Sequence, residues 1–208
     1  QTIVLRDITD PDDFSARKRA YDVAITAEGF VVVNTVIAPN NVTIKANGFD
    51  DLGYSVLDFN QAERNILARS VNIEAAGAIG QLMNPIEASF PIDIQSETFR
   101  ATTTQGDIAL KQGLISTALS VEAKGKGSHV LVESAAPTLR IRTITASNVL
   151  NPGSVTVRNG FGSLLDDNGP SPNVTGAVVN LAGKAGVGTA DDPIETAAFK
   201  LRAAATNP

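Results

Sequence analysis

The sequence predicts an all-β chain folded as a parallel β-helix, a solenoid of short strands stacked coil upon coil, with a less regular N-terminal section. Three observations lead to this fold class. Strand-like segments recur at a short and nearly regular spacing, the chain contains a long internal repeat, and aromatic residues make up only 5% of its 208 residues. Small β-branched and aliphatic side chains suit narrow stacked layers better than a globule built on aromatic anchors.

The internal repeat relates residues 71–110 to a shorter copy at residues 179–207. The offset between the copies is constant until a short deletion in the second copy. A unit of about 108 residues is too long for one solenoid coil, so we expect a superrepeat of several coils. The matching segments are VTIK at 42–45 with VTVR at 155–158, VNI at 71–73 with VNL at 179–181, IG at 79–80 with VG at 187–188, NPIE at 84–87 with DPIE at 192–195, and FRA at 99–101 with LRA at 201–203.

Composition limits the classes of partner and of chemistry. The net charge is −5 and no basic patch is dense, so no nucleic-acid partner is expected. The chain has no cysteine, so disulfides and thiolate chemistry are excluded. No apolar run approaches the roughly 20 residues of a membrane helix, so no membrane span is expected.

The N-terminal section, residues 1–46, is expected to hold strands and one short helix. A tight turn at Glu28-Gly29 would join two of these strands. The helix would start after Asp10-Pro11, a favourable cap and first-turn pair. The expected elements are strands at 2–8, 22–27, 30–37 and 42–46, and a helix at 14–21.

Residues 47–208 read as short strands separated by Gly, Asn, Ser and Pro turns, which predicts the β-helix repeats. Expected strands start at evenly spaced positions, Phe99, Leu119 and Leu139. A second series of strands, at Ile108, Val130 and Val155, recurs at a similar spacing. We expect each strand to stack on its sibling about 4.8 Å away, with eight or nine coils in all. The expected strands are 54–59, 71–75, 99–103, 107–110, 119–123, 129–134, 139–146, 154–159 and 174–182.

Two features of this section bear on the choice of fold. An antiparallel β-sandwich is the alternative, but few two-residue hairpin signals separate the strands. Gly80 is expected to turn with positive φ at a widened corner, and Gly106-Asp107 to turn into the next strand.

One set of residues in and just before the stretch 71–110 forms a recognisable motif. The set is Asn65-Ile66, Ala68, Val71, Ile73, Gly77, Ile79-Gly80, Asn84-Pro85-Ile86-Glu87, Phe99, Ala101, Thr103, Gly106-Asp107-Ile108 and Leu110. This motif resembles the recurring sequence of very large secreted bacterial adhesins, the filamentous-haemagglutinin-like and leukotoxin-like filamentous surface proteins. The resemblance covers the stretch 71–110 well and the C-terminal copy moderately, but the aromatic residue usual near Ile108-Ala109-Leu110 is missing.

This resemblance implies a right-handed parallel β-helix that is exported to the bacterial cell surface. The chain would be a structural rod or stalk segment that displays adhesive regions or assembles into an extracellular filament. Its partners would be neighbouring repeats of the same chain or end-to-end copies, and host or environmental glycans. A glycan-binding or polysaccharide-degrading β-helix module is the alternative. A glycan groove would need exposed aromatics, for which Tyr21, Tyr54 and Phe161 are the candidates.

No catalytic, cofactor-binding or metal-binding residue is predicted, and the chain is not expected to be an enzyme. His129 is the single histidine and opens a strand, so an exposed position on the coil is expected rather than a Ser–His–Asp site. The basic run 17–19 is expected to complement a helix dipole. A β-helix enzyme would need aligned charged groups, drawn from Asp107, Glu122, Glu133, Lys124, Arg140, Arg142 and Arg158.

Four acidic pairs are candidates for a Ca²⁺ site, because carboxylates in loops are hard oxygen ligands. None has the spacing of a calcium-binding loop, so solvated turns are the expected role. The pairs are Asp12-Asp13, Asp50-Asp51, Asp166-Asp167 and Asp191-Asp192.

Overall fold

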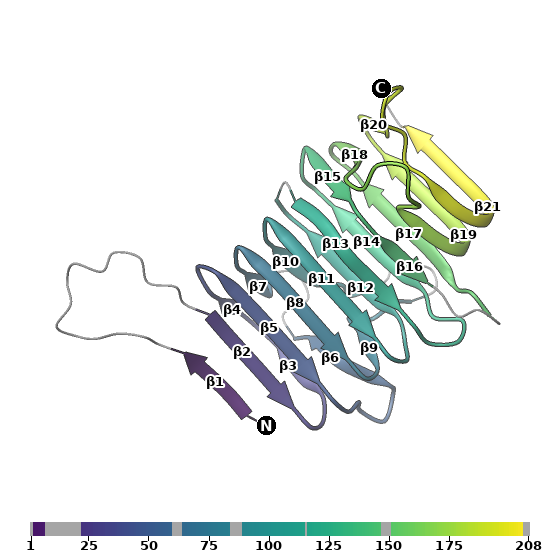
Figure 1. The fold of residues 1–208 in the computed structure, drawn as a ribbon. Helices are drawn as coiled ribbons and strands as arrows, with labels where there is room; N and C mark the ends of the chain where they lie inside the picture. The colour runs from purple at the N-terminus through teal and green to yellow at the C-terminus, as the bar shows by residue number, and fades with distance from the viewer. Residues whose placement is uncertain are drawn as a thin grey trace, which may run out of the picture.

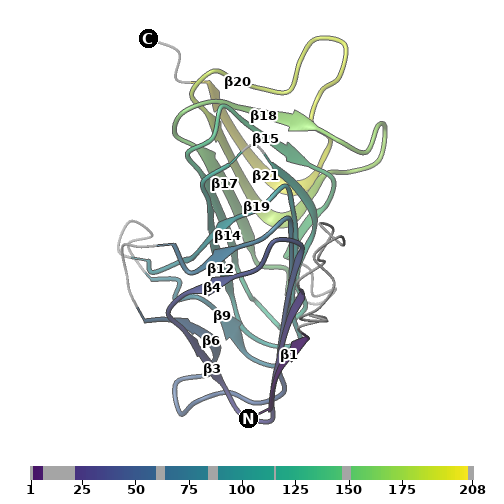
Figure 2. The same cartoon turned by 90° about the vertical axis from the view of Figure 1, so that its left-hand side faces the viewer.

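The computed structural model describes residues 2–6, 22–59, 64–83, 89–114, 116–146 and 151–205, and these form a parallel β-helix (Figure 1). The coils are stacked in sequence order from the N-terminal to the C-terminal end (Figures 1 and 2). Among the described residues only β1 (Thr2–Arg6) on β2 (Asp22–Ala27) and an isolated bridge between Gln81 and Phe90 pair antiparallel. The β-sandwich alternative is therefore wrong. The expected helix at 14–21 and the NPIE segment at 84–87 lie outside the described residues.

The first coils have three faces. The first face is the ladder β2, β5 (Asn41–Ala46), β8 (Ser70–Ala75), β11 (Thr98–Thr103) and β13 (Ser116–Ala123). The second is β3 (Val31–Val33), β6 (Tyr54–Asp58), β9 (Ala78–Ile79), β12 (Ile108–Gln112), β14 (Val130–Ser134) and β17 (Ser154–Asn159). The third is β4 (Val36–Ile37), β7 (Ile66–Leu67) and β10 (Ile92–Gln95).

The cross-section changes along the stack. β12 begins on β9 and ends on β10, so it merges the second and third faces. β13 then divides onto β15 (Thr138–Ile141) and β16 (Ile144–Ala146). The last coils are built from β18 (Ser163–Asp166), β19 (Val174–Gly183), β20 (Gly186–Val187) and β21 (Thr196–Ala205). Coils begin at β2, β5, β8, β11, β13, β15, β18 and β20, which makes eight in the described part of the chain.

The spacing of the second-face strands was predicted correctly. Ile108 pairs with Val130, and Val130 pairs with Val155. The prediction that Phe99, Leu119 and Leu139 stack on one another along the first face is wrong. Phe99 pairs with Ala118 and Arg100 with Ser120, so Leu119 is the extra residue of a β-bulge, and Leu139 pairs with Ser116. A bulge adds one residue to one strand, and an even spacing in the sequence does not reveal it.

The core consists of aliphatic ladders, as the composition predicts. One ladder runs through Val42, Val71 and Phe99, which are 0%, 1% and 1% exposed. Phe99 is the largest fully buried side chain, while other phenylalanines, such as Phe49 and Phe161, are exposed at corners. Aliphatic side chains therefore fill the interior, and most aromatic side chains in the described part of the chain lie at the surface.

Several element boundaries differ from the expected ones. The single strands expected at 30–37 and 139–146 are each divided in two, at Asn34-Thr35 and at Arg142-Thr143, because the chain turns a corner there. Glu28-Gly29 is also a corner, since β2 and β3 have no pairing with each other and stack on β5 and β6. Parallel stacking begins at β2, upstream of residue 46. Strands β7, β9, β10, β18, β20 and β21 were not predicted.

The superrepeat is visible as repeated backbone bonds. Phe59 N donates to Val33 O, and the counterpart Asp167 N donates to Ile141 O in the second unit, both at 3.0 Å. Gly80 and Gly188 both have positive φ, 66° and 65°, as expected for Gly80. Yet β5, β8 and β11 lie on the first face, whereas their counterparts in β17, β19 and β21 continue the second. The second unit is therefore turned about the axis, and counterpart strands point in opposite directions in Figure 1.

Candidate functional site

A buried asparagine joins three successive coils in the first unit. Asn65 is 0% exposed, and its Nδ2 donates to the backbone O of Val33, at 3.3 Å, and to Asp58 Oδ1, at 2.6 Å. Its Oδ1 accepts the backbone N–H of Asp93 in the next coil, at 2.7 Å. One amide thus satisfies polar groups on both neighbouring coils where water is excluded, which is a structural role.

The second unit contains the same arrangement at the counterpart position. Asn173 is 0% exposed, donates from Nδ2 to Ile141 O at 2.8 Å and to Asp166, and accepts the N–H of Glu195 at 2.8 Å. We name Asn65 and Asn173 the asparagine nodes. Sequence reasoning missed these nodes, although extending the offset of the repeat upstream from Val71 would have found both.

Carboxylates beside the nodes have pKa values shifted in opposite directions. Burial raises the pKa of Asp166, but hydrogen bonds from Asn173 and from the backbone of Asn168, Gly169 and Asp167 outweigh it and lower the pKa overall. Burial is also the largest influence on Asp93 and raises its pKa, with repulsion from Asp58 adding to the effect. Lys111, 3.0 Å from Asp93, only partly compensates. These shifts follow from packing and need no catalytic explanation.

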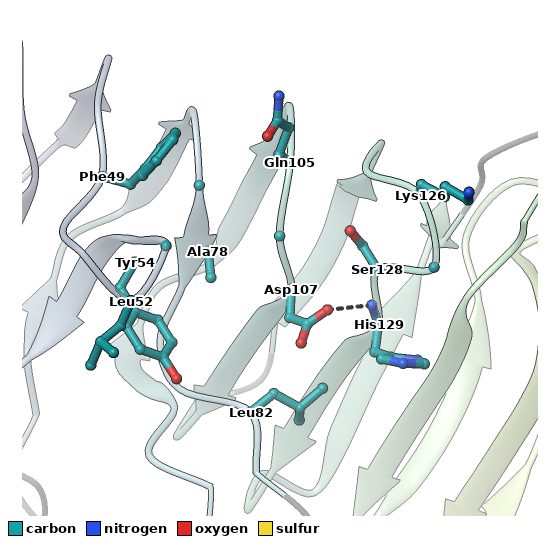
Figure 3. Close-up of a pocket in the computed structure, with 14 residues that line it drawn as sticks. Phe49, Leu52, Tyr54, Ala78, Leu82, Gln105, Asp107, Lys126, Ser128 and His129 are labelled. Atoms are coloured by element: carbon teal, nitrogen blue, oxygen red, sulfur yellow. Dashed lines mark hydrogen bonds between the residues drawn. The ribbon is translucent and has the colours of Figure 1, made fainter.

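His129 lies in a line of corner residues that does not form a catalytic triad. Its Nδ1 accepts the backbone N–H of Ser154 at 3.0 Å and lies 2.8 Å from Ser154 Oγ. Asp107 Oδ1 accepts the backbone N–H of His129 at 2.7 Å, so the carboxylate does not orient the imidazole (Figure 3). A triad requires the carboxylate to hold the ring nitrogen opposite the serine. Asp107 instead caps the N–H of His129, directly before β14, and His129 caps the N–H of Ser154, the first residue of β17.

Asp50 lies in a turn, as expected, but Asp166 is the last residue of β18 and only 4% exposed, so a solvated turn is wrong for Asp166. Asp50 accepts the N–H groups of Leu52 and Tyr54 at 3.0 and 2.9 Å. Partial desolvation and the charge of Asp166 raise the pKa of Asp192, although this residue is exposed. Among the described residues no group of three His, Asp or Glu side chains could hold a metal ion. Asp12-Asp13 lies outside them, as do the basic run 17–19 and Tyr21.

Most of the other candidate charges form ion pairs along or between coils. Lys124 lies 3.4 Å from Glu122, Arg158 lies 3.8 Å from Glu133, and Arg142 lies 3.2 Å from Asp167. The charge of Arg140 offsets only part of the rise in the pKa of Asp192. The structure thus distributes these charges over separate contacts, as expected for solubilising outer faces.

A groove of about 530 Å³ runs along the corner between the first and second faces. Figure 3 shows Phe49, Leu52 and Tyr54 on one side, Lys126 and His129 on the other, and Asp107 between them. Of the aromatic candidates for a glycan groove, the structure places Tyr54 here but not Phe161. Phe49, at 54% exposure, was missed.

Comparisons with known proteins give no relative for the chain. No family model, no curated protein and no solved structure matches it. No helix of the described residues is long and apolar enough to cross a membrane. The fold defines the class as a parallel β-helix repeat protein, and the resemblance to filamentous adhesins stays a prediction.

Proposed function

We propose that the chain is a structural rod segment of a secreted bacterial surface protein, which displays adhesive regions or assembles into an extracellular filament. The observation that carries this proposal is the superrepeat. The second unit reproduces the backbone bonds, the positive-φ glycine and the asparagine node of the first, and stacks on it by continuous parallel pairing. A unit that stacks on its own copy can lengthen a rod without a new interface.

The exposed edge of the C-terminal coil supports this proposal. Leu201 of β21 pairs with Val179, which is 0% exposed, and Leu201 corresponds to Phe99 in the first unit, but it is itself 50% exposed. A following coil, from a neighbouring repeat or an end-to-end copy, would bury Leu201 and pair with the edge of β21.

Labelling of cells tests the surface location. An antibody raised against the purified chain is applied to intact and to permeabilised cells of the producing bacterium. The proposal predicts labelling of intact cells along extended structures. Labelling that requires permeabilisation contradicts it.

A further inference from the structure

We propose that the groove between the first and second faces is a binding site for a neutral oligosaccharide chain that lies along the axis of the β-helix. This assignment goes beyond the rod function, because a rod segment needs no ligand. It rests on the lining of the groove, its direction, its charge and its rigidity.

The lining combines ring faces with hydrogen-bonding groups. Phe49 and Tyr54 present aromatic surface, and Leu52 extends it. Asp107 contributes a carboxylate, of which one oxygen accepts the His129 N–H. Since Nδ1 of His129 accepts the Ser154 N–H, a neutral ring carries its proton on Nε2 and can donate from there. Sugars present C–H faces that pack on aromatic rings, and hydroxyls that need both donors and acceptors.

The direction of the groove suits a chain of sugar units. Its walls come from four successive coils, at residues 49–54, 77–78, 105–107 and 126–129. Successive coils are about 4.8 Å apart, close to the length of one pyranose unit. A glycan laid across the coils would therefore meet one corner per sugar, the aromatic corner at residues 49–54 and polar corners at 105–107 and 126–129.

The charge of the groove favours a neutral ligand. Asp107 and Lys126 are the charged side chains among its lining residues, and their charges cancel. An acidic glycan would bring its carboxylates near Asp107, and a basic ligand would meet Lys126. Neutral hydroxyls fit this mixture of donors and acceptors best.

The aromatic wall is held in place before any ligand binds. Asp50 accepts the N–H groups of Leu52 and Tyr54 and donates its own N–H to Tyr54 O at 2.9 Å. Ser55 Oγ ties Gly48 O, at 2.6 Å, to Gly77 N, at 2.6 Å, on the next coil. A loop fixed in this way loses little conformational entropy on binding.

The second unit supplies a matched control. Phe161 follows Asn159-Gly160 as Phe49 follows Asn47-Gly48, and it is 63% exposed. The second unit has no counterpart of the loop that carries Leu52 and Tyr54, because the chain reaches β18 directly after Gly162. Phe161 does not line the groove, so its removal should leave binding unchanged.

Calorimetric titration of the whole chain tests the proposal. The probes are the neutral hexasaccharides cellohexaose, hexa-N-acetylchitohexaose and maltohexaose, with hexagalacturonate as the acidic comparison. We expect at least one neutral probe to bind with a Kd of about 1 mM or tighter. Phe49→Ala should weaken it about tenfold or more, and Phe161→Ala by less than about twofold. Circular dichroism verifies that both variants are folded.

Three results would overturn the proposal. They are no binding of any neutral probe, equal losses in Phe49→Ala and Phe161→Ala, and tighter binding of hexagalacturonate than of every neutral probe. Each leaves the rod function untouched, because that function does not depend on the groove.

Discussion

Replacing the second asparagine node tests whether buried side-chain bonds hold successive coils together. In Asn173→Ala the N–H of Glu195 loses its side-chain acceptor. Ile141 O keeps a bond from the N–H of Asp167, and Asp166 keeps bonds from two backbone N–H groups. The variant therefore leaves one N–H without a partner and removes the bonds that the two amide hydrogens share among Ile141 O, Asp166 and Asn168.

The magnitude follows from these losses. A buried donor left unpaired costs roughly 1–3 kcal/mol, and each other bond contributes about 1 kcal/mol. Because Glu195 is only half-buried and water can compensate in part, we expect a loss of roughly 3 kcal/mol in the free energy of unfolding. This is a large part of the total for a domain with a stability of about 5–15 kcal/mol.

Urea unfolding followed by circular dichroism measures the global effect, and amide hydrogen exchange at Glu195 measures the local one. The local measurement matters because stacked repeats need not unfold in a single step. Asn72→Ala is the matched control, since the Asn72 amide bonds Glu74 at the surface, at 3.2 Å. It should change stability by less than about 0.5 kcal/mol. Equal stabilities of the two variants, or unchanged exchange at Glu195, would refute the role of the node.

Three further predictions concern the core, the pH dependence and the corners. Phe99→Ala should reduce the free energy of unfolding by about 3–5 kcal/mol in the same urea assay. Leu201→Ala changes the counterpart position, which is half exposed, and should cost far less. Equal costs of the two substitutions would contradict the assigned core. Because burial raises the pKa of Asp93, its ionisation opposes folding, so stability should fall as the pH rises from about 4 through its folded pKa. Asp93→Asn should flatten this pH profile, and an unchanged profile contradicts the assignment. Gly153→Ala would press a Cβ against the backbone oxygen of Ser128 in the previous coil, so a large drop in Tm is expected, and an unchanged Tm argues against this close corner.

The spacing of strands in the sequence predicts which strands pair wherever no bulge interrupts the stack. The spacing of Ile108, Val130 and Val155 predicted their pairing correctly, because stacked strands of successive coils recur at a nearly constant interval. The bulge at Leu119 could not be predicted, since an added residue looks like an ordinary strand residue. Short strands such as β9 have two residues and leave no periodic signal.

The polar features were harder to predict than the fold. Asn65 resembles a turn residue in the sequence, and only the stacking of three coils shows that it is buried. The groove joins residues from 49 to 129 in four coils, so no local motif describes it. Tyr54 was identified as an aromatic candidate for a groove, but Phe49 was not. Only the loop between β5 and β6 reveals that Phe49 lines the groove and Phe161 does not.

Engineered disulfides test the central claim, that both units are stacked parallel coils in equivalent register. The chain has no cysteine, so introduced pairs react without background. Asn72 faces Arg100 in the first unit, and their counterparts Asn180 and Arg202 face each other in the second. Partners in adjacent strands are about 4.8 Å apart, which a disulfide can span.

Non-reducing gel electrophoresis after mild oxidation reports the bonds. The account predicts an intramolecular disulfide in Asn72→Cys/Arg100→Cys and in Asn180→Cys/Arg202→Cys. The control Asn72→Cys/Ser120→Cys spans two coils, about 9.6 Å, and should not close, because Ser120 pairs with Arg100. Closure of the control as readily as of either test pair, or failure of both test pairs, would contradict the parallel β-helix and its superrepeat.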